Sequence, residues 1–364
     1  MENKLYPLAR MSLEMMDMPQ SLLEHEIREQ PEALRRLLND EAANIQKVAA
    51  AIRARAPRFV LLAARGSSDN AARYGQYLFG AHNRLPVALA APSLFTLYKS
   101  PPNLSEALVL AVSQSGRSPD ILAVIQEGRR QGALTVAITN DIFSPLAAFA
   151  EQRINLRAGL ERSIAATKTY TASLLALAML SAALSQDVDQ RRALDLAPAL
   201  LSQTLAQADT VISAAAAYRE AEACVVIGRG YNYATAFETA LKLKELTYVL
   251  AEPYSSADFQ HGPVALVENG FLVLAIVPEG ETAAELTGFL QELKPRAPRL
   301  VVVSPFQPAL DLAATAISIP SGIPEWLSPL VAILPGQLFA LGLALAKGID
   351  PDQPRGLHKV TLTR

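Results

Sequence analysis

The sequence predicts an α/β protein made of two tandem doubly wound domains, each a parallel sheet covered by helices, with an N-terminal helix and a C-terminal tail. Short, continuous apolar runs alternate with longer helical patterns, which is typical of parallel strands buried on both faces and joined by helical crossovers. The same series of runs occurs twice along the 364 residues at a nearly constant spacing. This repetition indicates an internal duplication.

Four pairs of predicted strands carry the duplication. The run at 59–64 is closed by Arg65-Gly66 and the run at 224–228 by Arg229-Gly230, and the two glycines lie 164 residues apart. The other pairs are 108–112 with 272–276, 136–139 with 301–304, and 154–156 with 317–319. Four pairs at nearly one spacing are hard to obtain by chance, so each half is expected to form one sheet.

Helical patterns fill the segments between and around the strands. Residues 26–55 are predicted to be helical, with Pro31 near a helix start. The run 172–184, interpreted as the most apolar of the chain, has the length of a buried core helix and is too short to cross a bilayer. The expected parts are an N-terminal helical segment (1–50), a first domain (51–200), a second domain (201–347) and an ordered tail (348–364).

The composition favours a globular protein of a reducing compartment. Hydrophobic residues make up 51% and charged residues 19%, and the formal net charge is −2, so no broad basic surface for nucleic acid is expected. Residues 1–19 lack a basic start followed by an apolar stretch, so no signal peptide is expected. The single cysteine, Cys224, excludes an internal disulfide and a Cys-rich metal site, and its apolar neighbours predict a core residue. We expect a cytoplasmic protein that does not bind membranes.

The strongest candidate binding site is the 113–118 loop, which lies between a predicted strand and a helix start. Its residues are Ser113, Gln114, Ser115, Gly116, Arg117 and Ser118. Three hydroxyls, an amide and a helix N-terminus are the groups that hold a phosphate dianion without a lysine. An ordinary turn with Ser118 as N-cap is the alternative. The second copy, 277–282, keeps the glycine but not the first three side chains, which favours anion binding in the first half alone.

Two further groups of polar residues lie near predicted helix starts and faces. Ser67 and Ser68 follow the first strand, where they could bind a ligand or simply cap the next helix. Glu238, Lys242 and Glu245 fall on one face of a predicted helix by the i, i+4, i+7 rule. A solvated ion-pair face is the alternative interpretation of that second group.

His261 is held in a loop by the following Gly-Pro, and it could be structural or catalytic. His25 lies in a charged helical segment and His82 beside an Asn-Arg pair, so both are expected to be exposed.

These residues together resemble the double sugar-isomerase (SIS) domain family, in particular the isomerase half of glucosamine-6-phosphate synthase. The resemblance covers nearly the whole chain from Glu26 on, and the motifs occur in one order. They are Ser-Gln-Ser-Gly at 113–116, Ala-Ala-Thr-Lys-Thr at 165–169, Leu-Lys-Leu-Lys-Glu at 241–245, His-Gly-Pro at 261–263 and the tail at 352–359.

The sequence also departs from the synthase. Residues 113–118 and the Arg-Gly-Ser-Ser of 65–68 are closer to stand-alone members such as the second type of glucosamine-6-phosphate deaminase. His358 stands where the synthase usually has a small residue. No counterpart of the glutaminase domain with its cysteine nucleophile is found, so the chain is not expected to take nitrogen from glutamine by itself.

The resemblance implies a role for each candidate residue. Glu245 would move a proton between C1 and C2, His261 would help open the sugar ring in the neighbouring subunit of a homodimer, and Lys359 would condense with the open-chain ketose. Glu238 and Lys242 would support the site. The sugar phosphate would be held by Ser67, Ser68, Ser113, Gln114, Ser115, Ser118 and Ile164.

The implied activity is the conversion of glucosamine 6-phosphate to fructose 6-phosphate and ammonia, with no cofactor. The alternatives are a deglycase or isomerase of another phosphosugar, and a module that senses a sugar phosphate without catalysis.

Overall fold

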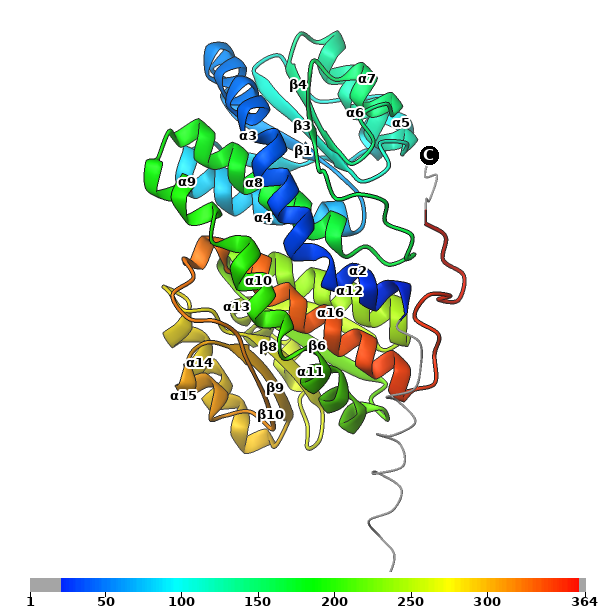
Figure 1. Cartoon of the computed structure of the whole chain (residues 1–364), viewed down its shortest axis with the longest axis vertical. Coiled ribbons are helices and arrows are strands. Elements are labelled where there is room, and N and C mark those ends of the chain that lie inside the picture. The colour runs from blue at the N-terminus through cyan, green and yellow to red at the C-terminus, as the bar shows by residue number, and fades with distance from the viewer. Residues whose placement is uncertain (1–20, 360–364) are drawn as a thin grey trace, which may run out of the picture.

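The structure, a computed structural model, describes residues 21–359. The signal-peptide prediction for residues 1–19 and the tail residues 360–364 lie outside this range. The described chain forms two five-stranded sheets, one above the other along the long axis of the molecule (Figure 1). All strand pairs in them are parallel. The prediction of two doubly wound α/β units is therefore confirmed.

Both sheets have the same strand order. The first is β2-β1-β3-β4-β5, and the second, read from the matching edge, is β7-β6-β8-β9-β10. The first sheet contains β1 (Phe59–Ala63), β2 (Val87–Leu89), β3 (Ala107–Ser113), β4 (Leu134–Thr139) and β5 (Gln152–Asn155). The second contains β6 (Ala223–Gly228), β7 (Leu250–Ser255), β8 (Leu272–Ile276), β9 (Arg299–Ser304) and β10 (Thr315–Ser318). Each strand has a counterpart in the other sheet, which confirms the duplication.

The sequence prediction missed the edge strands β2 and β7. β2 has three residues, none of them fully buried. β7 contains Glu252 and Pro253, and its first residue, Leu250, is 69% exposed. An edge strand has a free side, so it need not show the continuous apolar run of a central parallel strand. Proline also fits there because it cannot donate a hydrogen bond to a ladder.

Helices cover the faces of both sheets. The helices from the N-terminus through the first half are α2 (Leu22–Arg28), α3 (Gln30–Arg55), α4 (Ser67–Asn83), α5 (Ser93–Thr96), α6 (Pro119–Arg130), α7 (Pro145–Phe149), α8 (Lys168–Ser185) and α9 (Val188–Leu194). The rest are α10 (Ala197–Leu205), α11 (Ala208–Ala215), α12 (Tyr233–Thr247), α13 (Ser256–Gln260), α14 (Ala283–Leu293), α15 (Gln307–Leu310) and α16 (Ser328–Ala346).

Two helices, α8 and α16, are buried along almost their whole length. The run 172–184 forms most of α8, as predicted, but it is not the most apolar segment. That segment is 325–346, within which α16 lies, and among residues 21–359 it alone is long and apolar enough to cross a membrane. Because 89% of its apolar window lies inside the protein, α16 serves as the core helix of the second half.

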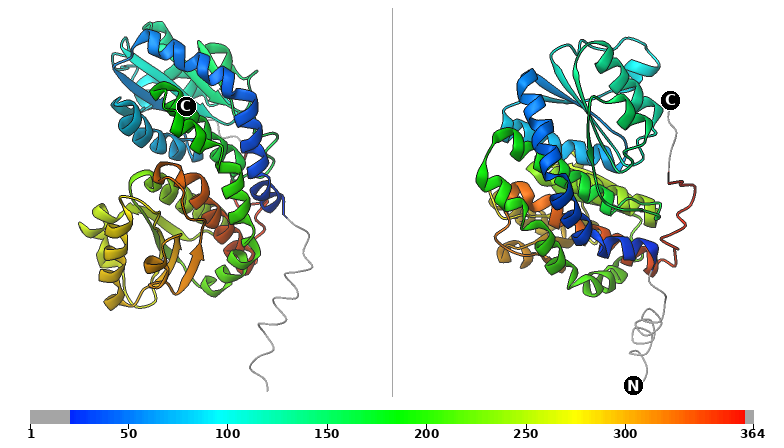
Figure 2. Two further views of the ribbon diagram at one scale, coloured as in Figure 1. Left: turned by 60° about the vertical axis from the view of Figure 1, so that its left-hand side comes forward. Right: turned by 45° about the horizontal axis from the view of Figure 1, so that its top comes forward.

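Several segments join the two halves, among them α4, α2 and the tail. The first-half helix α4 packs against α12 of the second half. α2 contacts α16, whereas α3 lies along α8 (Figure 2). The tail after α16 runs from the second half back toward the first (Figures 1 and 2).

The predicted N-terminal helix is divided into α2 and α3 at Glu29, with Pro31 in the first turn of α3. The division at residues 50, 200 and 347 stays a prediction.

Two single-residue expectations have opposite outcomes. Cys224 is a core residue as predicted, because it is 2% exposed and burial raises its pKa to about 12. The prediction that His82 is exposed is wrong. His82 is half-buried, with its ring centroid 5.3 Å from that of Trp326 and its Nε2 atom 3.3 Å from the Tyr231 hydroxyl. The end of α4 faces the second half here, a contact that the local sequence does not reveal.

Candidate active site

The N-terminus of α4 meets the middle of α12 at a group of buried charges. Glu238 is fully buried and accepts hydrogen bonds from Ser67 Oγ at 2.8 Å and Asn70 Nδ2 at 2.7 Å. Lys242 Nζ lies 3.4 Å from Glu238 Oε1 and 2.5 Å from Glu245 Oε2. The three charged residues share one face of α12, as predicted. The solvated-face alternative is wrong, because α4 covers this face.

Of the three charged side chains, only that of Glu245 is partly exposed to solvent. The side chain of Lys242 is 1% exposed, and that of Glu245 is 23% exposed. Burial by itself lowers the pKa of Lys242, but Glu245 and Glu238 together hold that pKa above its usual range. Lys242 is therefore a fixed cation, and Glu245 is the carboxylate that a ligand can reach.

The 113–118 loop forms a tight turn between β3 and α6. Gly116 has a φ of +61°, and a Cβ atom there would lie 2.1 Å from Ser144 Oγ, so only glycine fits. The backbone N–H of Gly116 donates to Ser113 Oγ at 3.1 Å. Ser118 occupies the N-cap position of α6, but its side chain makes no capping hydrogen bond. This geometry leaves the Ser118 hydroxyl at a helix N-terminus, where it can meet an anion.

The loops after β1 and β3 are held together at the carboxyl edge of the first sheet. β1 and β3 are adjacent parallel strands, so both loops leave the sheet at the same edge. Arg65 Nε donates to Asp120 Oδ2 at 2.6 Å, and the Asp120 side chain is fully buried in the first turn of α6. This ion pair ties the Ser67-Ser68 segment to the loop that carries the other serines.

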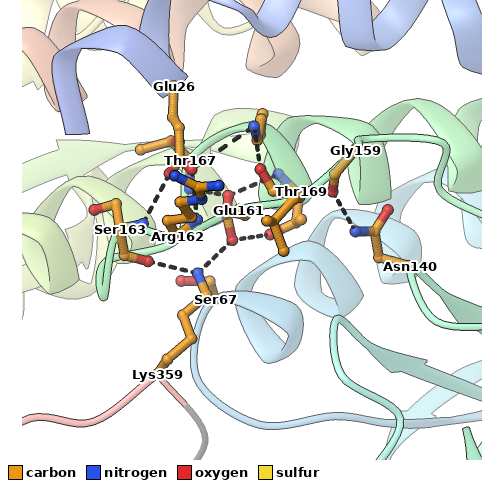
Figure 3. Close-up of polar contacts among 12 residues, drawn as sticks. Glu26, Ser67, Asn140, Gly159, Glu161, Arg162, Ser163, Thr167, Thr169 and Lys359 are labelled. Atoms are coloured by element: carbon orange, nitrogen blue, oxygen red, sulfur yellow. Dashed lines mark hydrogen bonds and ion pairs between the residues drawn. The ribbon is translucent and has the colours of Figure 1, made fainter. Parts of the chain in front are cut away.

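The tail brings Lys359 to the connection between β5 and α8. Lys359 Nζ donates to Glu161 Oε2 and to the carbonyl oxygen of Ser163, each at 2.7 Å (Figure 3). Ile164 follows directly and is half-buried. Glu161 acts electrostatically on Lys242, so the tail lysine lies in the same region as the charges on α12.

His261 is the one predicted catalytic residue that lies apart from these groups. It is the C-cap residue of α13 and is exposed. Within residues 21–359 its side chain makes no hydrogen bond or ion pair with Glu238, Lys242 or Glu245.

Four residues of this region were missed by the sequence analysis: Arg65, Asn70, Asp120 and Glu161. The sequence did contain a signal for Asn70. It lies one helical turn after Ser67, and it is a polar residue on the otherwise apolar buried face of α4. Glu161 lies three residues before Ile164, but nothing in the local pattern connects it with a lysine 198 residues away.

Comparisons with known proteins identify the family of the chain. The SIS domain model matches residues 55–183 and again residues 217–347. The glutamine–fructose-6-phosphate aminotransferase [isomerizing] of Pyrococcus horikoshii is 32% identical over 339 residues, which are 92% of this chain and 56% of that protein. The chain thus spans about half the length of the curated relatives it matches.

The fold of this chain is also similar to that of several solved structures. A candidate phosphosugar isomerase from Silicibacter pomeroyi DSS-3 is 37% identical with a TM-score of 0.82, covering 91% of this chain and all of the other. The glucosamine-6-phosphate deaminase of Thermotoga maritima has a TM-score of 0.76, covering 94% of this chain and 100% of its own; at 22% identity it shows the shared fold alone. The two halves of the duplication are two SIS domains in tandem, and the chain belongs to the SIS domain family.

Proposed function

We propose that this chain converts glucosamine 6-phosphate and water to fructose 6-phosphate and ammonia. The observation that carries the proposal is the buried cation Lys242 between Glu238 and Glu245, with Glu245 alone of the three open to solvent. A carboxylate that a ligand can reach, held in one orientation by a neighbouring ammonium group, is placed to take a proton from the carbon next to a carbonyl group. The similarity to isomerizing aminotransferases supports the same substrate class.

The first half would bind the substrate. The hydroxyls of Ser113, Ser115 and Ser118 and the N-terminus of α6 suit the 6-phosphate, because backbone N–H groups and hydroxyls there can all donate to one anion. Gln114 belongs to the same loop. The remaining contacts with the sugar are proposed for Ser67, Ser68 and Ile164.

Proton transfer would follow ring opening. Glu245 removes the proton from C2 of the open-chain amino aldehyde, which gives an enolamine, and returns a proton to C1. The product is the C2 imine of fructose 6-phosphate. Lys242, 2.5 Å from Glu245, holds the carboxylate in place during both steps.

Ammonia would leave through Lys359. The ammonium group of Lys359 passes a proton to the imine nitrogen on C2, and the amine that results attacks C2 and expels ammonia, which leaves a protonated lysine imine with the sugar. Water then adds to C2 and breaks the C–N bond, which releases fructose 6-phosphate and restores the ammonium group of Lys359. One water is consumed and one ammonia is formed for each sugar.

Incubation with glucosamine 6-phosphate tests the proposal. We expect ammonia and fructose 6-phosphate in equal amounts. Conversion of another phosphosugar to a ketose without ammonia would instead identify an isomerase. Release of an amino acid or another amine from a phosphosugar that carries it would identify a deglycase. Binding without turnover of any 6-phosphate would contradict an enzymatic role.

His261 is proposed to act in the site of a second subunit, because it is exposed and separate from Glu245 in its own chain. Mixing inactive Glu245→Gln and His261→Ala proteins after mild unfolding is expected to restore activity. Random pairing in a two-fold dimer rebuilds one intact site in each mixed dimer, so about a quarter of the wild-type activity should return. No recovery in demonstrably mixed dimers would place His261 in its own subunit's site.

A further inference from the structure

The connection between β5 and α8 contains a buried carboxylate that no step of the proposed reaction uses. The Glu161 side chain is fully buried. Its Oε1 atom accepts from the backbone N–H groups of Thr167 at 2.9 Å and Thr169 at 3.1 Å. Its Oε2 atom accepts from Thr169 Oγ1 at 2.7 Å and from Lys359 Nζ at 2.7 Å. Both oxygens are therefore held in one orientation.

The charge of this carboxylate is also maintained. Burial by itself raises the pKa of Glu161, but Lys359 and the hydrogen bonds from Thr167 and Thr169 hold that pKa below its usual value. Glu161 is accordingly ionised at neutral pH, and it presents a fixed negative charge to the tail.

The other acceptor of Lys359 is fixed from the opposite side. Glu26 of α2 accepts from the backbone N–H groups of Arg162 at 2.5 Å and Ser163 at 3.1 Å (Figure 3). The backbone at Ser163, whose carbonyl oxygen receives Lys359, is thus fixed by α2.

The tail reaches this position over two earlier anchors. Asp352 accepts from the backbone N–H groups of Leu22 and Leu23 at 2.8 and 2.9 Å, which caps α2. The backbone N–H of Arg355 donates to the Tyr248 hydroxyl at 2.7 Å, directly after α12. After Arg355, the described part of the tail is tied to the rest of the protein by the two hydrogen bonds of Lys359.

We propose that Glu161 is the positioning residue of Lys359. Its carboxylate receives the lysine head group and holds it beside Ile164, from where the amine can reach C2 of a bound sugar. Glu161 itself does not touch the sugar. The catalytic consequence rests on the proposed function, whereas the anchoring of the tail does not.

The anchoring can be measured without any substrate, by the rate at which trypsin cleaves after Arg355. Glu161→Gln keeps the size of the side chain and an acceptor for the Thr167 and Thr169 amides but removes the charge. We expect cleavage about tenfold faster in Glu161→Gln and in Lys359→Met, and no additional increase in the double variant. Equal rates in Glu161→Gln and wild type, or multiplicative effects in the double variant, would overturn the proposal.

Glu41→Gln is the matched control. Glu41 is also buried, at 4% exposed, and it holds the other end of the same connection through Arg157, at 2.9 Å. Its loss weakens the connection without touching the tail lysine. Its effect on cleavage is expected to be the same factor with and without Lys359→Met.

Turnover provides the catalytic test. Glu161→Gln is expected to lower kcat about tenfold or more with little change in KM, because the sugar contacts are intact and only the amine is misplaced. An unchanged kcat would overturn the catalytic part. If the wild-type protein turns over no phosphosugar, the proposed function fails, and the cleavage rates still decide whether Glu161 positions Lys359.

Discussion

Replacing Glu245 by Gln is expected to lower kcat for glucosamine 6-phosphate by about 10²- to 10⁴-fold, the usual contribution of a general base. The amide has nearly the same volume and its oxygen can still accept from Lys242, but it cannot take a proton from C2. Affinity for fructose 6-phosphate should be nearly unchanged, because the 113–118 loop lies on a different element. Steady-state kinetics measure the first effect, and the rise in melting temperature with added sugar phosphate measures the second.

Glu252→Gln provides the control for this variant. Glu252 lies on β7 and pairs with Lys244 of α12 at 3.7 Å, with both side chains largely exposed. Its replacement removes the same charge near the same helix and is expected to leave kcat unchanged.

Full activity of Glu245→Gln would assign the proton transfer to another group. Loss of the ligand-induced rise in melting temperature would assign Glu245 to binding.

Much of the fold could be predicted from the sequence because the same series of strands occurs twice along the chain. Central parallel strands are buried on both faces, so β1, β3 and β4 and their counterparts β6, β8 and β9 appear as apolar runs. These runs recur in the same order, and each series ends with the shorter run of an edge strand, β5 or β10. Adjacent parallel strands release their loops at one edge, which is why Ser67 and the 113–118 loop could be expected together. The edge strands β2 and β7 lack this pattern, because β2 has only three residues and β7 contains a glutamate and a proline.

The site was less accessible to sequence reasoning because its contacts join distant segments. From the sequence alone, the face of α12 that carries Glu238 has the pattern of an exposed row of ion pairs. In the structure α4 covers this face, and its residue Ser67 is 171 residues away from Glu238. The partner of Lys359 is 198 residues away. Periodicity within a helix shows which side chains share a face, but not which element from the other half covers that face.

Replacing Lys242 by Met is expected to lower the free energy of unfolding by about 3–5 kcal/mol, because it leaves a buried carboxylate without its cation. Glu238 is fully buried and would retain only the hydrogen bonds from Ser67 and Asn70. Burial already raises the pKa of Glu238, against Lys242 and Asn70, so removing the ammonium raises it further. The loss of stability should therefore be greatest at neutral pH and shrink at lower pH, where Glu238 takes up a proton. Urea unfolding at several pH values measures it.

Lys244→Met separates this effect from the general loss of a lysine on α12. Lys244 is 40% exposed and lies 3.7 Å from the exposed Glu252, so its replacement should cost no more than about 1 kcal/mol. Adding Glu238→Gln to Lys242→Met should recover part of the stability, because a neutral amide can still accept from Ser67 and Asn70 and leaves no unpaired charge. If Lys242→Met were no less stable than Lys244→Met, Glu238 would have to be neutral or hydrated in the folded protein. Lys242 would then not be the fixed cation that holds Glu245.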